Sequence, residues 1–174
     1  MKIVSPFIET LARETNGTAV FGMISGENIF VVDKYEGNQN VGFTLRIGHR
    51  LHMTLGSHGI SLVAFMPQEK RKNILLRKKL FFYGDPASLD MKRLQNDLEQ
   101  CRRKGYAADT GGITPGVTFV SAPVFGLHSK IIGCVILIGT FSAHLIEEVG
   151  MKTAYVGRQI SYRLGADMKN ILRE

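Results

Sequence analysis

The tetrapeptide at positions 56–59, Gly-Ser-His-Gly, places a hydroxyl group next to an imidazole, the two groups that a serine hydrolase uses for nucleophilic attack. The spacing does not suit that chemistry. A nucleophile elbow has the pattern G-x-S-x-G, and a histidine adjacent to its serine in the sequence cannot easily act as its base. We therefore predict a helix start here and no catalytic residue.

The sequence gives equally little support for metal or cofactor chemistry. His49 and His52 are three residues apart and His58 follows, but this pattern lacks a third ligand at a spacing typical of zinc sites. Cys101 and Cys134 form no CxxC pair, and we interpret them as packed thiols. The chain has neither a Walker A nor a GxGxxG pattern. We expect no metal and no cofactor.

The formal charge of +7 is the one unusual bulk property of the chain. Much of it lies in the segment EKRKNILLRKK, residues 69–79, which would attract phosphate groups. The segment has no interleaved aromatic residues for base stacking and no recognition-helix pattern. Two interpretations stay open: a solvated connector, which we favour, and a patch that contacts phosphates.

The length of 174 residues is enough to bury a core, and nothing in the sequence marks a second domain, so we predict one domain over residues 1–174. A membrane-spanning helix needs 18 or more consecutive apolar residues, and the sequence contains no such run. The N-terminal MKIVSPF lacks the apolar stretch of a secretory signal. The cytoplasm is the default expectation.

Predicted helices and strands alternate along the chain, and together they must position any binding site. Hydrophobic spacing, capping residues and turn residues predict a helix over 6–15 with Ser5 as its N-cap, two strands within 18–37, a strand over 41–48, a short buried helix (or, as the alternative, a strand) over 60–67, a helix from 85–91 to 104, a hairpin over 116–139, and a helix from Ser142 to Gly165. This order indicates a mixed α/β (α+β) fold with an antiparallel sheet.

The hairpin, GVTFVSAPVFGLHSKIIGCVILIG, is apolar on both sides. A turn centred between residues 128 and 129 would pair Phe119 with Ile138 and Ser121 with Ile136, so that these four side chains share one face of the sheet. Their neighbours along each strand share the other face and are also apolar. Both faces must therefore be covered. Helices can cover one, and the other needs a lid, a partner subunit or a ligand.

Three stretches, in this order and at this spacing, resemble the C-terminal effector-binding domain of IclR-type transcriptional regulators: LHMTLGSHGISLVAFMP, LEQCRRKGYAAD and PGVTFVSAPVFGLHSKIIGCVILIGTF. The resemblance covers nearly the whole chain. It implies a GAF- or PAS-like antiparallel sheet with helices on one face and a ligand cup on the other. In the family this domain usually follows a DNA-reading winged helix-turn-helix, for which this chain has no room. We interpret the chain as an excised domain or as a stand-alone sensor.

The resemblance also implies a set of pocket residues. At Gly56 and Ser57, backbone amides of a helix N-terminus would hold the carboxylate of the effector, because first-turn N–H groups are unpaired and the dipole is positive there. Asp109 matches an acidic position at the pocket rim. The remaining candidates would form the floor and the wall of the pocket: Phe119, Ser121, Ile136, Ile138, Phe43 and Leu45.

This candidate floor is more apolar than the resemblance implies. Relatives that sense small keto acids often carry Cys or Ser at positions 119, 136 and 138, where this chain has Phe, Ile and Ile. Three lost hydrogen bonds of ~1 kcal/mol each would weaken a small polar ligand about a hundredfold. Burying on the order of 100 Å² of ligand against the apolar wall would contribute ~2.5 kcal/mol. An apolar or aromatic organic acid is therefore favoured, although a filled core with no pocket stays open as the alternative.

We therefore predict a non-enzymatic sensor domain in which the effector shifts the equilibrium between arrangements of subunits. The implied partners are a small organic acid, further copies of the chain in a homodimer or homotetramer, and DNA only through a helix-turn-helix domain outside this chain. Two alternatives remain. One is a stand-alone nucleic-acid-binding domain that acts through residues 70–79, and the other is a small GAF-like hydrolase or lyase that acts through Ser57 and His58.

Overall fold

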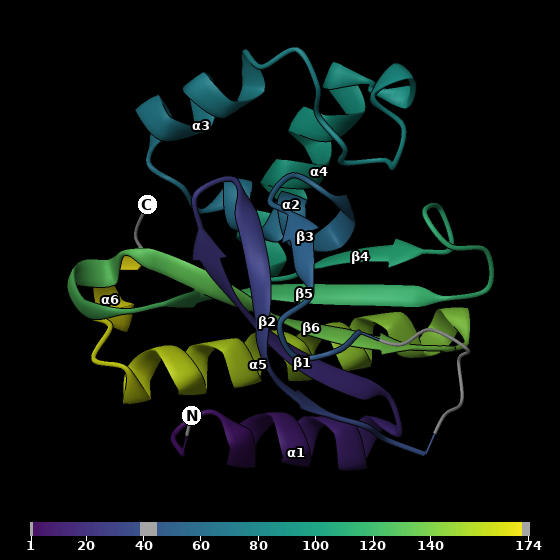
Figure 1. Cartoon of the computed structure of the whole chain (residues 1–174), viewed down its shortest axis with the longest axis vertical. Coiled ribbons are helices and arrows are strands. Elements are labelled where there is room, and N and C mark those ends of the chain that lie inside the picture. The colour runs from purple at the N-terminus through teal and green to yellow at the C-terminus, as the bar shows by residue number, and fades with distance from the viewer. Residues whose placement is uncertain (1, 39–44, 172–174) are drawn as a thin grey trace.

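The computed structural model describes residues 2–38 and 45–171. Their strands form one six-stranded sheet (Figure 1). Each strand pairs antiparallel with its neighbours, in the spatial order β3-β2-β1-β6-β5-β4. The strands are β1 (Thr18–Ser25), β2 (Asn28–Tyr35), β3 (Arg50–His52), β4 (Ala107–Thr110), β5 (Thr118–Phe125) and β6 (Ile131–Gly139). The predicted mixed α/β fold with an antiparallel sheet is confirmed.

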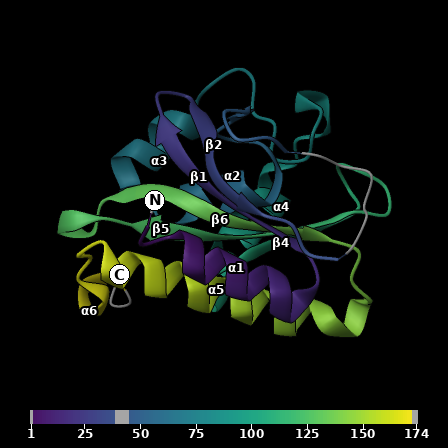
Figure 2. The ribbon, with the colours of Figure 1, turned by 60° about the horizontal axis from the view of Figure 1, so that its bottom comes forward.

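Helices lie on both sides of the sheet, whereas we expected them on one face with a ligand cup on the other (Figures 1 and 2). The α-helices are α1 (Ser5–Thr15), α2 (Gly56–Ala64), α3 (Gln68–Leu75), α4 (Met91–Lys104), α5 (Ile146–Arg163) and α6 (Met168–Ile171). One face carries α1 and α5, which lie side by side, and the other carries α2 with α4 packed against it. None of the helices in the described residues is long and apolar enough to cross a membrane.

The β5–β6 hairpin has the predicted register. Phe119 lies opposite Ile138 and Ser121 opposite Ile136, and the register shifts only at Phe125, next to the turn. The two faces of the hairpin belong to two separate cores: Ile136 and Ile138 pack toward α2 and α4, whereas Val120 and Leu137 pack toward α1 and α5. Both faces are therefore covered, as the alternation of apolar residues requires.

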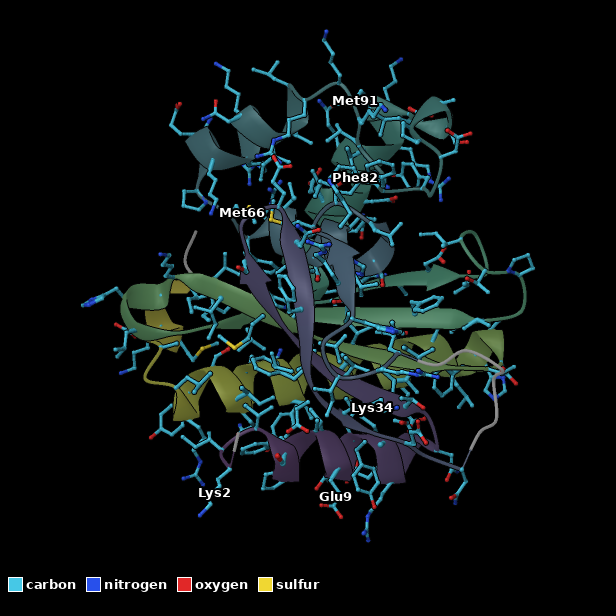
Figure 3. The ribbon with its side chains drawn as sticks, viewed as in Figure 1. Lys2, Glu9, Lys34, Met66, Phe82 and Met91 are labelled. Atoms are coloured by element: carbon cyan, nitrogen blue, oxygen red, sulfur yellow. The ribbon has the colours of Figure 1, made fainter. Side chains whose placement is uncertain are left out.

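Helix α2 is the short buried helix predicted over 60–67, but it begins at Gly56, so the Gly-Ser-His-Gly residues form its first turn rather than precede it. All nine of its residues are buried, and it packs against β5, β6, β4 and α4. Helix α4 begins after Asp90, whose side chain accepts hydrogen bonds from the amides of Lys92 and Arg93, and it ends at Gly105 in the left-handed conformation. Phe82, labelled in Figure 3 among these helices, fills the space above the sheet and is buried.

Several local predictions need correction. Residues 45–48 lie in a loop and a turn rather than in a strand, and the third strand is instead β3; residues 41–44 lie outside the described residues. Ser5 is the first residue of α1 rather than its N-cap, which is Val4, and the Ser5 hydroxyl donates to Asp33 of β2. A 3₁₀ turn follows Ser142, whose side chain caps nothing, so α5 starts at Ile146.

The basic segment is a helix over part of its length, where we predicted a connector. Residues 68–75 form α3, because Ile74 is buried in the core and anchors the helix. The side chains of Glu69, Lys70 and Lys72 are exposed, whereas Arg71 is half-buried. Arg77, which follows the helix, forms an ion pair with Glu27 at 2.9 Å.

Candidate functional site

A cavity of about 180 Å³ lies between the start of α2, the β5–β6 hairpin and the loop that connects β4 to β5. Its walls are mainly apolar and come from separate parts of the chain. The lining residues are Leu45, Leu51, Leu55, Gly56, Ser57, His58, Asp109, Ile113, Thr114, Phe119 and Ile136. No lysine or arginine is among these described residues, so the described part of the wall offers a ligand no cationic side chain.

The first turn of α2 forms one end of the cavity, and two glycines shape it. Gly56 has a φ of +56°, and a Cβ added there would lie 2.7 Å from Cδ1 of Ile113. A Cβ at Gly59 would lie 2.4 Å from the carbonyl carbon of Thr54. Both positions therefore require glycine, which allows the chain to turn sharply from β3 into α2 and to present the helix start to the cavity.

Ser57 presents unpaired polar groups at this helix start. Its side chain is only 2% exposed, and its Oγ has no hydrogen-bond partner among the described residues. The amides of Ser57 and His58 belong to the first turn, where no preceding helical carbonyl is within reach, and neither donates a backbone hydrogen bond in the described structure. A buried polar group without a partner is costly, so this end of the cavity favours a ligand with acceptor atoms.

His58 lines the cavity as a neutral imidazole. Burial lowers the pKa of His58 to about 4, because the charged form loses its hydration. Its Nε2 lies 3.1 Å from the carbonyl oxygen of His52, which can only accept, so Nε2 carries the proton and Nδ1 does not. His58 therefore adds no positive charge to the site. It also forms no hydrogen bond with Ser57, which removes the base that a catalytic serine needs.

Asp109 holds the loop that covers the other end of the cavity. Its two carboxylate oxygens accept hydrogen bonds from the amides of Gly112 and Ile113, at 3.0 and 3.1 Å. These bonds place the side chain of Ile113 against Gly56 and in the cavity wall. The carboxylate of Asp109 thus lies at the edge of the cavity and organises the loop.

The structure brings six of the nine predicted site residues together around this cavity: Leu45, Gly56, Ser57, Asp109, Phe119 and Ile136. Ser121 and Ile138 are almost fully buried and are not among the lining residues. The hydroxyl of Ser121 lies 2.9 Å from that of Ser61 and joins β5 to α2, and Ile138 belongs to the core. Phe43 lies outside the described residues.

Sequence reasoning missed five lining residues: Leu51, Leu55, His58, Ile113 and Thr114. A signal for one of them was available. Ile113 is the one bulky apolar residue in the segment GGITPG, and an apolar side chain between glycines and a proline is unusual for a purely solvated loop. The leucines gave no such signal. Leu51 belongs to β3, whereas the third strand was predicted over 41–48, and Leu55 is the residue that precedes α2.

The other candidate chemistry has structural uses. His49 and His52 each accept a hydrogen bond from a backbone amide through Nδ1, from Arg46 and Thr54 respectively. Within the described residues, no group of three or more His, Cys, Asp and Glu side chains is arranged to hold a metal ion. Cys101 and Cys134 are buried thiols, as predicted, and burial raises the pKa of each to about 12.

Comparison with known proteins identifies relatives of this fold and sequence. The family model described as "Bacterial transcriptional regulator IclR C-terminal" matches residues 1–161. The chain is 26% identical to the HTH-type transcriptional regulator KipR of Bacillus subtilis, over 94% of this chain and 67% of KipR. It is 30% identical to the HTH-type transcriptional regulator XynR of Escherichia coli, over 75% of this chain and 52% of XynR.

Solved structures of relatives share the fold. The crystal structure of the Thermotoga maritima IclR matches with a TM-score of 0.85 and 25% identity, over 95% of this chain and 68% of that chain. The relatives are named as transcriptional regulators and not as enzymes, in agreement with the prediction of a domain without catalytic activity. The chain belongs to the family of IclR-type bacterial transcriptional regulators, and it corresponds to the C-terminal, effector-binding domain of that family.

Proposed function

We propose that this domain senses a small organic acid with an apolar or aromatic body, which binds in the cavity at the start of α2. The observation that carries the proposal is the buried hydroxyl of Ser57, which has no partner among the described residues and lies beside two first-turn amides. A carboxylate can accept hydrogen bonds from all three groups at the positive end of the helix dipole.

The walls of the cavity support the apolar part of this ligand. Leu45, Leu51, Phe119 and Ile136 offer only carbon atoms beyond the helix start, so the body of the ligand gains stability by leaving water. The volume of about 180 Å³ is below the ~300 Å³ at which pockets for drug-sized ligands begin. The ligand is accordingly small, with a single ring or a short branched chain.

The effector in this proposal acts by shifting the balance between arrangements of subunits, and DNA is read by a helix-turn-helix domain outside these residues. The names of KipR and XynR as HTH-type regulators support this division of roles. The cytoplasm, where the chromosome of a bacterium lies, remains the predicted location.

Self-association is part of the same proposal. Three large apolar side chains, Met151, Tyr155 and Tyr162, are exposed on α5 at spacings of four and seven residues, which places them on one face of the helix. Such a surface favours a homodimer or a homotetramer with closed symmetry. Light scattering over a concentration series should give at least twice the mass of the chain, and a monomer at every concentration would contradict self-association.

The ligand proposal is tested by titrating benzoate, phenylacetate and pyruvate into the purified chain and measuring the melting temperature. We expect a saturable rise with at least one aromatic acid and a smaller rise with pyruvate. Ser57→Ala removes one charge-assisted hydrogen bond and should weaken binding about tenfold. Ser88→Ala, at an exposed position away from the cavity, is the matched control and should bind as the parent does. Equal affinity in Ser57→Ala and the parent would place the ligand elsewhere.

A further inference from the structure

A second and larger cleft lies at the opposite end of α2 from the cavity. It encloses about 990 Å³ between the end of α2, the start of α3, the turn of the β5–β6 hairpin and the C-terminal segment that contains α6. Helices α3 and α6 lie on the same side of the molecule as this hairpin turn in Figures 1 and 2. Met66, labelled in Figure 3, is among the lining residues.

Two arginines from different helices converge in this cleft. Nη1 of Arg71, on α3, donates to the backbone oxygen of Ala64 at 3.3 Å, and Nη1 of Arg102, on α4, donates to the same oxygen at 3.4 Å. The two guanidinium groups are therefore close neighbours. Within the described residues neither forms an ion pair. The pKa of Arg71 is lowered, first because the group is partly buried and second because the positive charge of Arg102 repels its own.

Capping of α2 explains only part of this arrangement. Ala64 is the last residue of the helix, and a cation at a helix C-terminus is stabilising. A guanidinium has five N–H donors, however, and each arginine uses Nη1 alone for this contact, which leaves donors of both free to bind the same molecule. An anion that presents two oxygens would pair with both groups and remove their repulsion.

The surroundings of the arginines define the rest of the ligand. Phe65 and Phe125 lie edge to face beside them, with ring centroids 5.8 Å apart, and supply an apolar wall. A smaller adjoining hollow shares Arg102 and both phenylalanines with the cleft, and its lining adds three more cations, Arg103, Lys104 and Arg158. Asp167 is the single acidic residue in the described lining of the cleft.

We propose that the cleft is a second binding site, for an organic dianion such as a phosphate ester or a dicarboxylate. Two oxygens of the ligand bridge Arg71 and Arg102, and its apolar part lies on Phe65 and Phe125. The volume suits a small molecule, since ligand pockets span ~300–1,000 Å³. The site differs in charge from the cavity at the start of α2, whose described lining has no lysine or arginine, and it does not depend on the function proposed for that cavity.

The test is a calorimetric titration of the parent chain with phenyl phosphate and with inorganic phosphate, at ionic strength held constant with sodium chloride. We expect saturable binding of both, with phenyl phosphate the tighter because of its ring. Arg71→Gln and Arg102→Gln should each weaken phenyl phosphate at least tenfold. Lys92→Gln, which removes one positive charge from an exposed position of α4 outside the cleft, is the matched control and should bind as the parent does.

Three results would overturn the proposal. The first is an absence of saturable binding by the parent, and the second is parental affinity in both arginine variants, each shown to be folded by circular dichroism. If Arg102→Gln fails to fold, Arg102→Lys replaces it in the test. Lysine retains the charge but not the planar fork, so we expect its affinity to lie between that of the parent and that of Arg71→Gln. The third is a loss of phenyl phosphate binding in Ser57→Ala, which would place the anion in the first cavity. Within the first result, binding of a DNA duplex that the two arginine variants weaken would show that the cleft serves nucleic acid instead of a small ligand.

Discussion

The two faces of the central hairpin have similar composition but different packing partners. On one face Val120 and Leu137 are 0% exposed and are packed beneath α1 and α5. On the other face Phe119 and Ile136 border the cavity under the first turn of α2. The strands supply apolar side chains to both faces, so their composition does not decide where a cavity remains. The covering helices decide it. On one face the long helix α5 fills the space above the strands, whereas on the other face the short helix α2, which begins with glycine, leaves a cavity.

The largest expected effect tests this difference in packing. Leu137→Ala removes a fully buried side chain and should reduce the free energy of unfolding by about 3–4 kcal/mol. Phe119→Ala, although it removes more atoms, should cost only about 1–2 kcal/mol, because Phe119 is partly exposed and already borders a cavity. Urea denaturation measures both values. A larger cost for Phe119→Ala than for Leu137→Ala would show that the cavity wall is packed as tightly as the closed face.

The second prediction concerns pH and the face that bears the cavity. The unfolded chain binds a proton at His58 below pH ~6.5, whereas the folded chain binds it only below about 4, so the stabilising effect is complete above pH ~6.5 and is lost as the pH falls toward 4. The loss amounts to about 3 kcal/mol. We would compare unfolding free energies of the parent and His58→Gln between pH 7 and 4. The variant should have a flatter profile, and parallel profiles would contradict the buried neutral imidazole.

The third prediction concerns the first turn of α2, where we expect the smallest change in stability. Gly56→Ala introduces a methyl group at a positive φ and against Ile113, and it should cost about 2 kcal/mol. Ile113→Val removes Cδ1, the atom that the new methyl would meet, so the double variant should recover part of that cost. Thermal unfolding of the four proteins in this cycle measures the coupling. Strictly additive costs would mean that the loop does not press on the helix start.

The sequence predicted the fold where local patterns and tertiary packing agree. Alternation and turn position sufficed for the register of Phe119 with Ile138, because a hairpin is fixed by its own turn. The same reasoning failed at 41–48, where alternating residues suggested a strand but the described portion, 45–48, forms a loop that delivers Leu45 to the cavity.

The candidate site could be predicted only in part. Gly56 and Ser57 could be named because the resemblance to the IclR family implies them, and the unpaired amides of a helix start give the physical reason. The sequence could not predict which floor residues reach the cavity. Ile136 and Ile138 share a face, and only the position of α2 above them makes Ile136 a lining residue and Ile138 a core residue. The role of Asp109 as the support of a loop depends on amides that follow it in the chain, and no side-chain pattern in the sequence reports such bonds.

The two buried thiols give the cavity-bearing face a property of its own. Cys101 and Cys134 both belong to the core beneath α2 and α4, and the core on the α1 and α5 side contains no cysteine among its described members. In alkylation the thiolate is the nucleophile that attacks the reagent, and the thiolate form is scarce at neutral pH while these groups stay buried. The rate of alkylation therefore measures how often the core beneath α2 and α4 opens to solvent, so the two thiols are a built-in probe of local unfolding on the face that bears the cavity.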